Sequence, residues 1–233
     1  MTDVLANAVW HSLLNAHAPH ADAHGLARRY DPDVSVFHGI DEPTDDAWDD
    51  LAPLAMNGVV VLFRESPLPE PPAGWKVLFA GEGHQMVRKR RGVDAPELPD
   101  IATMRPLTDE DVPAMVDLVT RTEPGPFRPR TIDLGGYVGI FHGDALVAMA
   151  GRRMHPPGYV EVSAVCTDPS ARRRGYASIV TVAVADAIAE AGETPMLHVA
   201  DDNPNARAVY EQLGFVTVRM CGFSALGVPR SPH

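Results

Sequence analysis

Cysteine is scarce in this sequence and long apolar runs are missing, and each deficiency excludes a class of protein. The 233 residues include two cysteines, Cys166 and Cys221, which are too few for a disulfide framework. One bridge between them is possible, but free thiols in a reducing cytoplasm are the simpler interpretation. No apolar run approaches the roughly 20 residues that a membrane helix needs. The start, Met1-Thr2-Asp3, lacks the basic residues and the apolar stretch of a secretion signal. We therefore expect a cytoplasmic protein without a membrane segment.

Positive charge is also in short supply. The formal net charge is −11, and the first 100 residues contribute most of it, with 8 basic and 16 acidic residues against 12 and 15 in the remainder. Such a chain binds DNA, RNA and anionic lipid poorly, because neutralisation of phosphates dominates that binding. We therefore expect neither a nucleic acid nor a membrane as partner. One local cluster, Arg172-Arg173-Arg174, is still able to hold a small anion.

Proline, by contrast, is abundant and gathers in two segments. The first runs from Ser66 to Pro72 and has too much proline for a helix or a central strand. Because it lies between strand-like runs at 59–63 and 75–80, we interpret it as a long hairpin loop. The second segment, 94–100, has no periodic pattern of apolar residues, and a new series of predicted strands and helices follows it. We predict a domain boundary there, with an N-terminal α/β domain of unknown role at residues 1–97 and a second domain at 98–233.

The second predicted domain alternates strands with helices. Thr108 is a typical helix N-cap, and three carboxylates follow it in the first turn, where they suit the helix dipole. A nearly all-apolar segment predicts a buried helix from Gly175 to Ala191, and Asn203-Pro204 is a typical helix start. Strands are expected at 101–105, 137–141, 145–151, 159–167, 195–200, 215–220 and 222–226. This order predicts an α/β (α+β) fold in which helices flank a mixed sheet.

One strand-to-helix connection has the chemistry of an anion site. The strand ends at Val165-Cys166-Thr167, a short arginine-rich loop follows, and the apolar helix opens at Gly175. Free backbone N–H groups and the dipole at a helix start both favour negative charge. Gly175 lets the backbone approach a ligand closely, and Ala177 keeps the neighbouring contact small. The expected ligand is a pyrophosphate.

The same residues resemble a known family. Arg172-x-x-Gly175-x-Ala177 is similar to the Arg/Gln-x-x-Gly-x-Gly/Ala signature of the GNAT superfamily of N-acetyltransferases, at the same place between the fourth strand and the next helix. A second match follows at the family's spacing, and it consists of Asn203, Ala206, Tyr210 and the segment Leu213-Gly214-Phe215. The resemblance extends from Ile101 to Leu226. The segment 161–169 most resembles a branch that includes the C-terminal half of glycine N-acyltransferases.

The resemblance implies a GNAT fold, with a mixed, mostly antiparallel sheet flanked by helices, and it implies acetyl-CoA as co-substrate without a metal. In the family, backbone amides of the arginine loop bind the CoA pyrophosphate, and the end of the fourth strand pairs with the pantetheine arm like an added strand. The implied cofactor-binding residues are Val165, Cys166, Thr167, Arg172, Arg173, Arg174, Gly175, Tyr176, Ala177, Ser178, Asn203, Ala206 and Tyr210. The strand-rich second half of residues 1–97 is a candidate for a degenerate copy of the same fold.

Two residues are implied to be catalytic. The family's tyrosine at the position of Tyr210 protonates the leaving thiolate, and a neutral phenol of pKa about 10 suits that role. From spacing alone, Tyr210 also fits an aromatic residue that packs in the core. Glu161 stands in an otherwise uncharged strand, on the same face as Val165 if no bulge intervenes. Glutamate near this position is the base in several family members, and burial is expected to raise its pKa. The alternative for Glu161 is a glutamate at an edge or on a solvated face.

Together these residues predict direct transfer of an acyl group from acetyl-CoA to a primary amine in a ternary complex. A backbone N–H near 165–167 is expected to stabilise the oxyanion. A small-molecule amine and a peptide amine fit equally well as acceptor, and the protein is expected to be a monomer or a homodimer. The alternative function is a non-catalytic acyl-CoA sensor, which keeps the cradle but lacks a competent acceptor site.

Three other clusters carry weaker signals. Pro19 interrupts any helix that would bring the N-terminal histidines together, so we expect surface histidines rather than a metal site. These histidines are His11, His17, His20 and His24. Cys166 is expected to be a small apolar strand residue rather than an acyl-carrying nucleophile. The basic run Arg88-Lys89-Arg90-Arg91 is interpreted as the solvated end of a strand, with a role near the CoA phosphates as the alternative.

Overall fold

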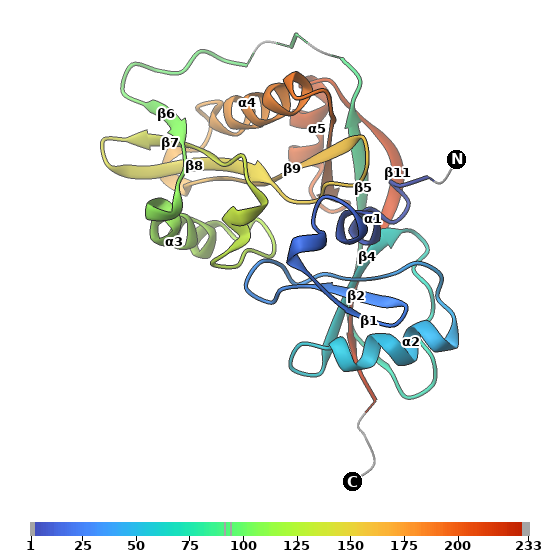
Figure 1. Cartoon of the computed structure of the whole chain (residues 1–233). Coiled ribbons are helices and arrows are strands. Elements are labelled where there is room, and N and C mark those ends of the chain that lie inside the picture. Colours follow the sequence, from blue (N-terminus) through green and yellow to red (C-terminus); the bar gives the residue numbers. More distant parts are fainter. Residues whose placement is uncertain (1–2, 91, 94, 230–233) are drawn as a thin grey trace.

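The computed structural model describes residues 3–90, 92–93 and 95–229 (Figure 1). Within these residues eleven strands form one sheet, in the order β1-β2-β3-β4-β11-β5-β10-β9-β8-β7-β6. Figure 1 shows α4 on one side of β7–β9 and α3 on the other. The predicted fold class, a mixed sheet flanked by helices, is confirmed. Among the helices that the structure describes, none is both long and apolar enough to cross a membrane.

The C-terminal elements follow the predicted order. They are β6 (Thr103–Pro106), α3 (Val112–Thr122), β7 (Val138–His142), β8 (Ala145–Arg152), β9 (Tyr159–Thr167), α4 (Tyr176–Glu190), β10 (Thr194–Ala200), α5 (Pro204–Gln212) and β11 (Phe215–Gly227). Strands β6 to β9 are successively antiparallel, whereas β10 runs parallel to β9. Thr108 and Asp111 form a capping box in the 3-10 turn that precedes α3. The two strands predicted at 215–220 and 222–226 are one strand, with a register shift against β5 between Thr217 and Arg219.

The N-terminal elements build the other end of the sheet. They are α1 (Ala8–Leu14), β1 (Ala21–His24), β2 (Ala27–Tyr30), β3 (His38–Ile40), α2 (Asp45–Leu51), β4 (Val59–Glu65) and β5 (Lys76–Arg88). Thr44 caps α2 by accepting a hydrogen bond from the backbone N–H of Ala47 at 3.3 Å. Trp48 of α2 is buried and packs edge-on against Trp75, with ring centroids 5.1 Å apart. The helix therefore covers its own end of the sheet with a separate apolar cluster.

Strand β5 connects the two halves of the chain. It pairs antiparallel with β11 on one side and with β10 on the other. Strand β11 pairs in turn with β4, so β4 and β5 are not neighbours and the predicted hairpin is wrong. The proline-rich segment instead passes over β11, where Leu68 lies against Gly222. A division at residues 97 and 98 therefore does not separate two sheets, because β5 lies between two C-terminal strands.

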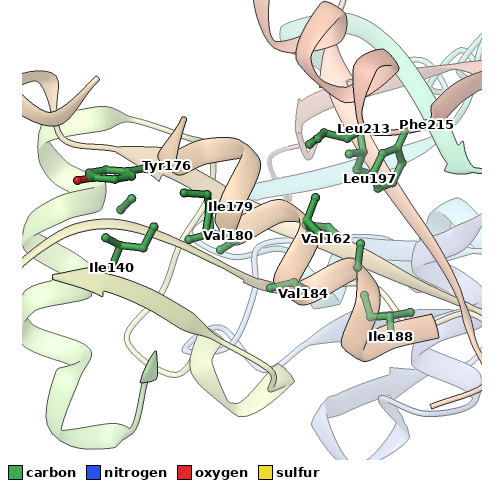
Figure 2. Close-up of a cluster of buried hydrophobic side chains, with 14 of the residues drawn as sticks. Ile140, Val162, Tyr176, Ile179, Val180, Val184, Ile188, Leu197, Leu213 and Phe215 are labelled. Carbon is green, nitrogen blue, oxygen red and sulfur yellow. The ribbon is translucent and has the colours of Figure 1, made fainter. Parts of the chain in front are cut away.

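Helix α4 is the centre of the largest apolar cluster (Figure 2). Its residues Val180, Val184 and Ile188 are at most 1% exposed. A helix that is apolar all round is stable only where protein covers it. Here the sheet covers one side, and the segment around Leu213 and Phe215 covers another (Figure 2). This packing fixes the start of α4 against the ends of β9 and β10.

The position of β5 generates a prediction about fragments. Residues 101–233 alone lose β5, which leaves the facing edges of β10 and β11 without a partner and exposes the apolar residues that β5 covers. We expect this fragment to show no cooperative unfolding transition by circular dichroism. Mixing it with residues 1–100 is expected to restore the transition. A fragment that unfolds cooperatively on its own, with the helix content expected for α3 to α5, would contradict this account.

Candidate functional site

The site begins where β9 and β10 separate. Within the described residues the two strands pair over one short stretch, where Tyr159–Glu161 of β9 run parallel to Thr194–Met196 of β10. Farther along, β9 carries a bulge, because its register against β8 shifts between Ser163 and Cys166. Ala164 in this bulge has a φ of 53°. The extra residues have no partner on β8, so their backbone groups are available to a ligand. The bulge also takes Glu161 out of the simple alternation with Val165.

A cavity of about 750 Å³ occupies the gap between the two strands. This volume is in the range of small-molecule sites. The predicted site residues that line it are Val165, Cys166, Thr167, Arg172, Arg173, Gly175, Tyr176, Ala177, Ser178, Asn203, Ala206 and Tyr210. Sequence reasoning missed other lining residues, which are Thr122–Gly125 after α3, His198–Ala200 on β10, Asp202 and Val209. Of the predicted set, Arg174 and Glu161 do not line the cavity.

The start of α4 forms one wall of this cavity. Within the described residues, no hydrogen bond takes up the backbone N–H groups from Arg172 to Ser178, and the helix has no side-chain cap. Arg172 and Arg173 are exposed at the same place. Gly175 has a φ of 78°, which favours glycine. Tyr176 contributes backbone rather than its ring, because its buried hydroxyl lies 2.7 Å from His142 Nε2. The wall thus has the donors and the positive charge that an anion needs.

The chemistry of the lining fits CoA. The Thr167 hydroxyl is buried and has no hydrogen-bond partner among the described residues. A buried polar group without a partner costs about 1–3 kcal/mol. The bulged backbone beside it leaves main-chain groups unpaired, and the free amides at the start of α4 line the same cavity. An extended ligand with amides along its length and a pyrophosphate at one end matches these groups.

Tyr210 lies on α5 and faces the cavity. Asn203 caps this helix by accepting a hydrogen bond from the backbone N–H of Ala206 at 3.1 Å. The Tyr210 ring packs edge-on against Phe215, with centroids 6.2 Å apart. Burial raises the pKa of Tyr210 to about 12. The side chain therefore packs against the core and also presents a protonated phenol to the cavity.

Glu161 is completely buried in a network of charged side chains. Arg153 Nε donates to Oε2 at 2.8 Å, Arg153 Nη2 donates to Oε1 at 2.6 Å, and His198 Nδ1 lies 2.7 Å from Oε1. Burial by itself raises the pKa of Glu161, but the charges and hydrogen bonds of Arg153 and His198 outweigh it and hold the pKa well below its usual range. The expected rise in pKa is therefore wrong, and so is a solvated position for this glutamate. The expectation failed because both partners come from other elements.

His198 connects this network to the cavity. Its Nε2 lies 3.0 Å from the Gln85 side-chain nitrogen, and that nitrogen also donates to the Leu5 carbonyl at 3.1 Å. The Gln85 nitrogen is therefore a donor, so Nε2 accepts and Nδ1–H donates to Glu161. Phe63 packs edge-on against the imidazole, with centroids 4.5 Å apart. Sequence reasoning passed over His198, although it is the one titratable side chain in the segment 195–200.

The discounted clusters have mixed outcomes. Burial raises the pKa of Cys166 to about 11, so this residue is a thiol rather than a thiolate. His17 is buried, with Nδ1 2.8 Å from the Tyr30 hydroxyl, which corrects its expected place on the surface. Within the described residues, no group of three or more His, Cys, Asp or Glu side chains is placed to hold a metal ion. Arg88 is also buried and pairs with Asp186 instead of ending in solvent, whereas Arg91 lies outside the described residues.

Comparisons with known proteins find relatives of this fold. The profile of the family described as FR47-like protein matches residues 137–224. A solved structure from Novosphingobium aromaticivorans, assigned to the GNAT family of acetyltransferases, is 33% identical over 98% of this chain and 100% of that chain, with a TM-score of 0.86. A GCN5-related N-acetyltransferase from Kribbella flavida shares the fold at 19% identity, over 99% of this chain and 98% of that chain, with a TM-score of 0.65.

A search of curated proteins finds no significant match. The narrower resemblance to glycine N-acyltransferases stays a prediction. The Novosphingobium aromaticivorans structure matches this chain along its whole length, and its 33% sequence identity is high enough to show a common family. On that basis this chain belongs to the GNAT family of acetyltransferases.

Proposed function

We propose that this chain transfers an acyl group from acetyl-CoA to a primary amine, which attacks directly in a ternary complex. The observation that carries the proposal is the cavity between β9 and β10. It combines unpaired backbone N–H groups at the start of α4 with the protonated phenol of Tyr210. Membership of the GNAT family supports acyl transfer in general. The choice of acetyl-CoA, the acceptor and the residue roles are our proposal.

Three parts of the cavity would hold the cofactor. The backbone amides of 172–178, with Arg172 and Arg173, take the pyrophosphate, and Arg174 adds positive charge nearby. On the side of β9 that faces β10, the main chain of 165–167 pairs with the pantetheine arm as an added strand would. Asn203 and Ala206 form the opposite wall at the start of α5. The amine acceptor, a small molecule or a peptide, approaches where the strands separate.

The thioester of acetyl-CoA supplies an acyl carbon that amines can attack. The chain orients the two reactants, an effect worth up to about 7–11 kcal/mol. Backbone N–H groups of the β9 bulge stabilise the charge that develops on the carbonyl oxygen. As the new C–N bond forms and the C–S bond breaks, Tyr210 donates its phenolic proton to the sulfur. Its pKa of about 12 keeps the phenol protonated until that moment.

The attacking nitrogen must also lose a proton, and we assign that role to His198. A carboxylate whose pKa is held low is a weak base, so Glu161 is a positioning residue. It fixes the Nδ1–H tautomer of His198 and stabilises the imidazolium that forms. Nε2 takes the proton once the Gln85 amide nitrogen, which lies 3.0 Å from it, has turned away from the ring. The Gln85 Oε1 atom is buried and has no partner among the described residues, so rotation of this amide would offer an acceptor to the new Nε2–H.

A broad panel of amines tests the proposal as a whole. Acetyl-CoA is mixed with protein and each amine, release of free CoA thiol is followed, and products are identified by mass spectrometry. The proposal requires thiol release that depends on both protein and amine, with an acylated product. Binding of acetyl-CoA without turnover across the panel would instead make the chain an acyl-CoA sensor.

The anion wall generates a prediction about Gly175. A Cβ at Gly175 would lie 2.9 Å from Pro96 Cγ, so a Val side chain there displaces the start of α4, and acetyl-CoA affinity is expected to fall by at least about tenfold, or about 1.4 kcal/mol. Gly192→Val is the matched control, because Gly192 lies just beyond the other end of α4, has a φ of 85°, and would place a Cβ with no atom of the described residues within 4 Å. Both variants carry the same kind of backbone strain, and the Gly175 variant adds the contact with Pro96 at the start of α4. If calorimetry finds equal acetyl-CoA affinities in the two variants, the start of α4 is not part of the binding site.

A second prediction concerns Tyr210. Tyr210→Phe keeps the ring that packs on Phe215 and removes the proton donor. We expect kcat to fall roughly 10²-fold or more, with acetyl-CoA affinity little changed. Tyr137→Phe is the control, since the Tyr137 hydroxyl is also buried, has no hydrogen-bond partner among the described residues, and lies outside the cavity lining. A Tyr210→Phe enzyme with full kcat would leave this tyrosine with a packing role alone.

A third prediction separates Glu161 from His198. Glu161→Gln leaves the buried Arg153 without its counter-charge and is expected to cost about 3–5 kcal/mol of unfolding free energy. His198→Gln keeps the pair of Arg153 and Glu161, so we expect a smaller loss of stability. Its kcat is expected to fall, because the proposed base is removed. Urea unfolding and steady-state kinetics measure these effects, and a His198→Gln enzyme with full kcat would contradict the assignment.

A further inference from the structure

Strand β10 presents its side chains to two different sides of the sheet. Leu197 and Val199 point to the side of α4 and belong to its apolar cluster. Because side chains alternate along a strand, His198 between them points to the other side, where it contacts Phe63 and Gln85. The proposed cofactor walls, at the starts of α4 and α5, lie on the helix side. An amine that gives its proton to His198 therefore reaches it from the side away from these helices.

The strand register places further side chains on the same side as His198. Residues that are paired across antiparallel strands share a face. Gln85 of β5 is paired with His198, and Gly81 lies an even number of residues before Gln85, with no register shift between them. Gly81 is paired in turn with Phe223 of β11, and Phe223 is paired with Phe63 of β4. The aromatic residues of β4 and β11 thus share a face with the proposed base.

These aromatic side chains form a continuous row, which consists of Phe63, Phe223 and Phe79. Phe63 packs edge-on against the His198 imidazole, with centroids 4.5 Å apart, and against Phe223 at 6.2 Å. Phe223 packs in turn against Phe79 at 5.6 Å. Phe79 is 56% exposed, so the aromatic row begins at the proposed base and ends in solvent. Such a surface favours an aromatic ligand, because burial of a ring removes apolar area from water and ring pairs add attraction.

The space over Gly81 is open beside the aromatic row. A Cβ on Gly81 would lie 3.5 Å from two carbons of the Phe79 ring. Apart from the chain neighbours of Gly81, no other atom of the described residues would lie within 4 Å of that Cβ. The Phe79 ring therefore borders a space above β5 that no described side chain fills, and this space is on the side to which His198 points.

The charged side chains that β4, β9 and β11 carry on this side are already paired. Arg219 lies between two carboxylates, with Nη2 2.6 Å from Asp3 and Nη1 3.1 Å from Glu65. Glu161 is held by Arg153 at 2.6 Å. These arginines are therefore not free to bind the carboxylate of an amino acid, and these carboxylates are not free to bind a second ammonium group. The aromatic row is the recognition surface that remains.

We propose that the aromatic row binds the acceptor, and that the acceptor is a primary amine with an aromatic ring close to its nitrogen. The inference rests on the proposed function, because it takes His198 as the group that receives the proton of the amine. With the nitrogen at His198, a ring on a short alkyl link lies against Phe63 and Phe223. The same ring extends toward the space over Gly81.

Calorimetry of amines with the full chain, loaded with CoA, tests this acceptor class without turnover. Phenethylamine is expected to bind at least about tenfold more tightly than ethylamine, because its ring is buried on the aromatic row. Free phenylalanine and diaminobutane are expected to bind more weakly than phenethylamine, since each adds a charge that finds no free partner. A tripeptide that begins with phenylalanine carries the same amine and ring. Its affinity relative to phenethylamine distinguishes a peptide from a free amine as the source of the acceptor.

Two variants test the position of the ring. Phe79→Ala removes the exposed end of the aromatic row and is expected to lower the preference for phenethylamine over ethylamine by about threefold or more. Leu78→Ala is the matched control, because Leu78 is 58% exposed and lies beside Gly227 instead of on the aromatic row. Gly81→Leu fills the open space, so it is expected to abolish the preference while ethylamine binds as it does to the wild type. Circular dichroism of each variant establishes that the fold is kept.

The proposal is overturned if phenethylamine does not bind, or if it binds no more tightly than ethylamine. A preference for phenethylamine that Phe79→Ala and Gly81→Leu both leave unchanged would overturn it as well. The proposed function fails separately. Thiol release with amines of every kind, without an aromatic preference, would leave acyl transfer standing and remove the aromatic row from the acceptor site. Binding of phenethylamine that depends on Phe79, without thiol release, would support the row and contradict acyl transfer.

Discussion

The buried carboxylate of Glu161 is the interaction on which the site depends. It lies at the last point where β9 and β10 pair, and Arg153 and His198 hold it there as an ion. Beyond this point the strands separate and the cavity opens. Burying such a group adds little net stability, because the loss of hydration offsets the attraction between charges. Its effect is geometric, since it fixes the imidazole of His198 at the edge of the cavity.

The first hundred residues complete this arrangement from the opposite side. Gln85 and Leu5 set the tautomer of His198, Phe63 packs on its ring, and Arg153 lies over the Phe37 ring at 5.3 Å from the centroid. A degenerate copy of the GNAT fold in these residues stays a prediction. Their role in the structure is plain in either case. They supply β5, the strand between β10 and β11, and they surround the charged network that positions the proposed base.

Local signals in the sequence predicted much of the fold after residue 100. The cap at Asn203, the apolar length of α4 and the bounds of β9 all depend on short-range preferences, and the arginine loop is a contiguous motif. Pairing between distant segments was beyond such reasoning. No residue pattern in or beside β5 predicts that this strand lies between β10 and β11. Likewise, no pattern in the sequence of β9 predicts the bulge at Ala164. The environment of Glu161 was missed for the same reason, since its partner His198 is 37 residues away and on another strand.

Hydrogen exchange in the presence of acetyl-CoA tests the central claim most directly, because it reports which backbone amides the cofactor protects. The account predicts slower exchange in two segments, the end of β9 with the loop and first turn of α4, at 164–178, and the start of α5, at 203–210. It predicts no change at 76–82, which lies on another part of the sheet. Binding of acetyl-CoA that leaves 164–178 unprotected, or that protects a different region, would contradict the assignment of this cavity.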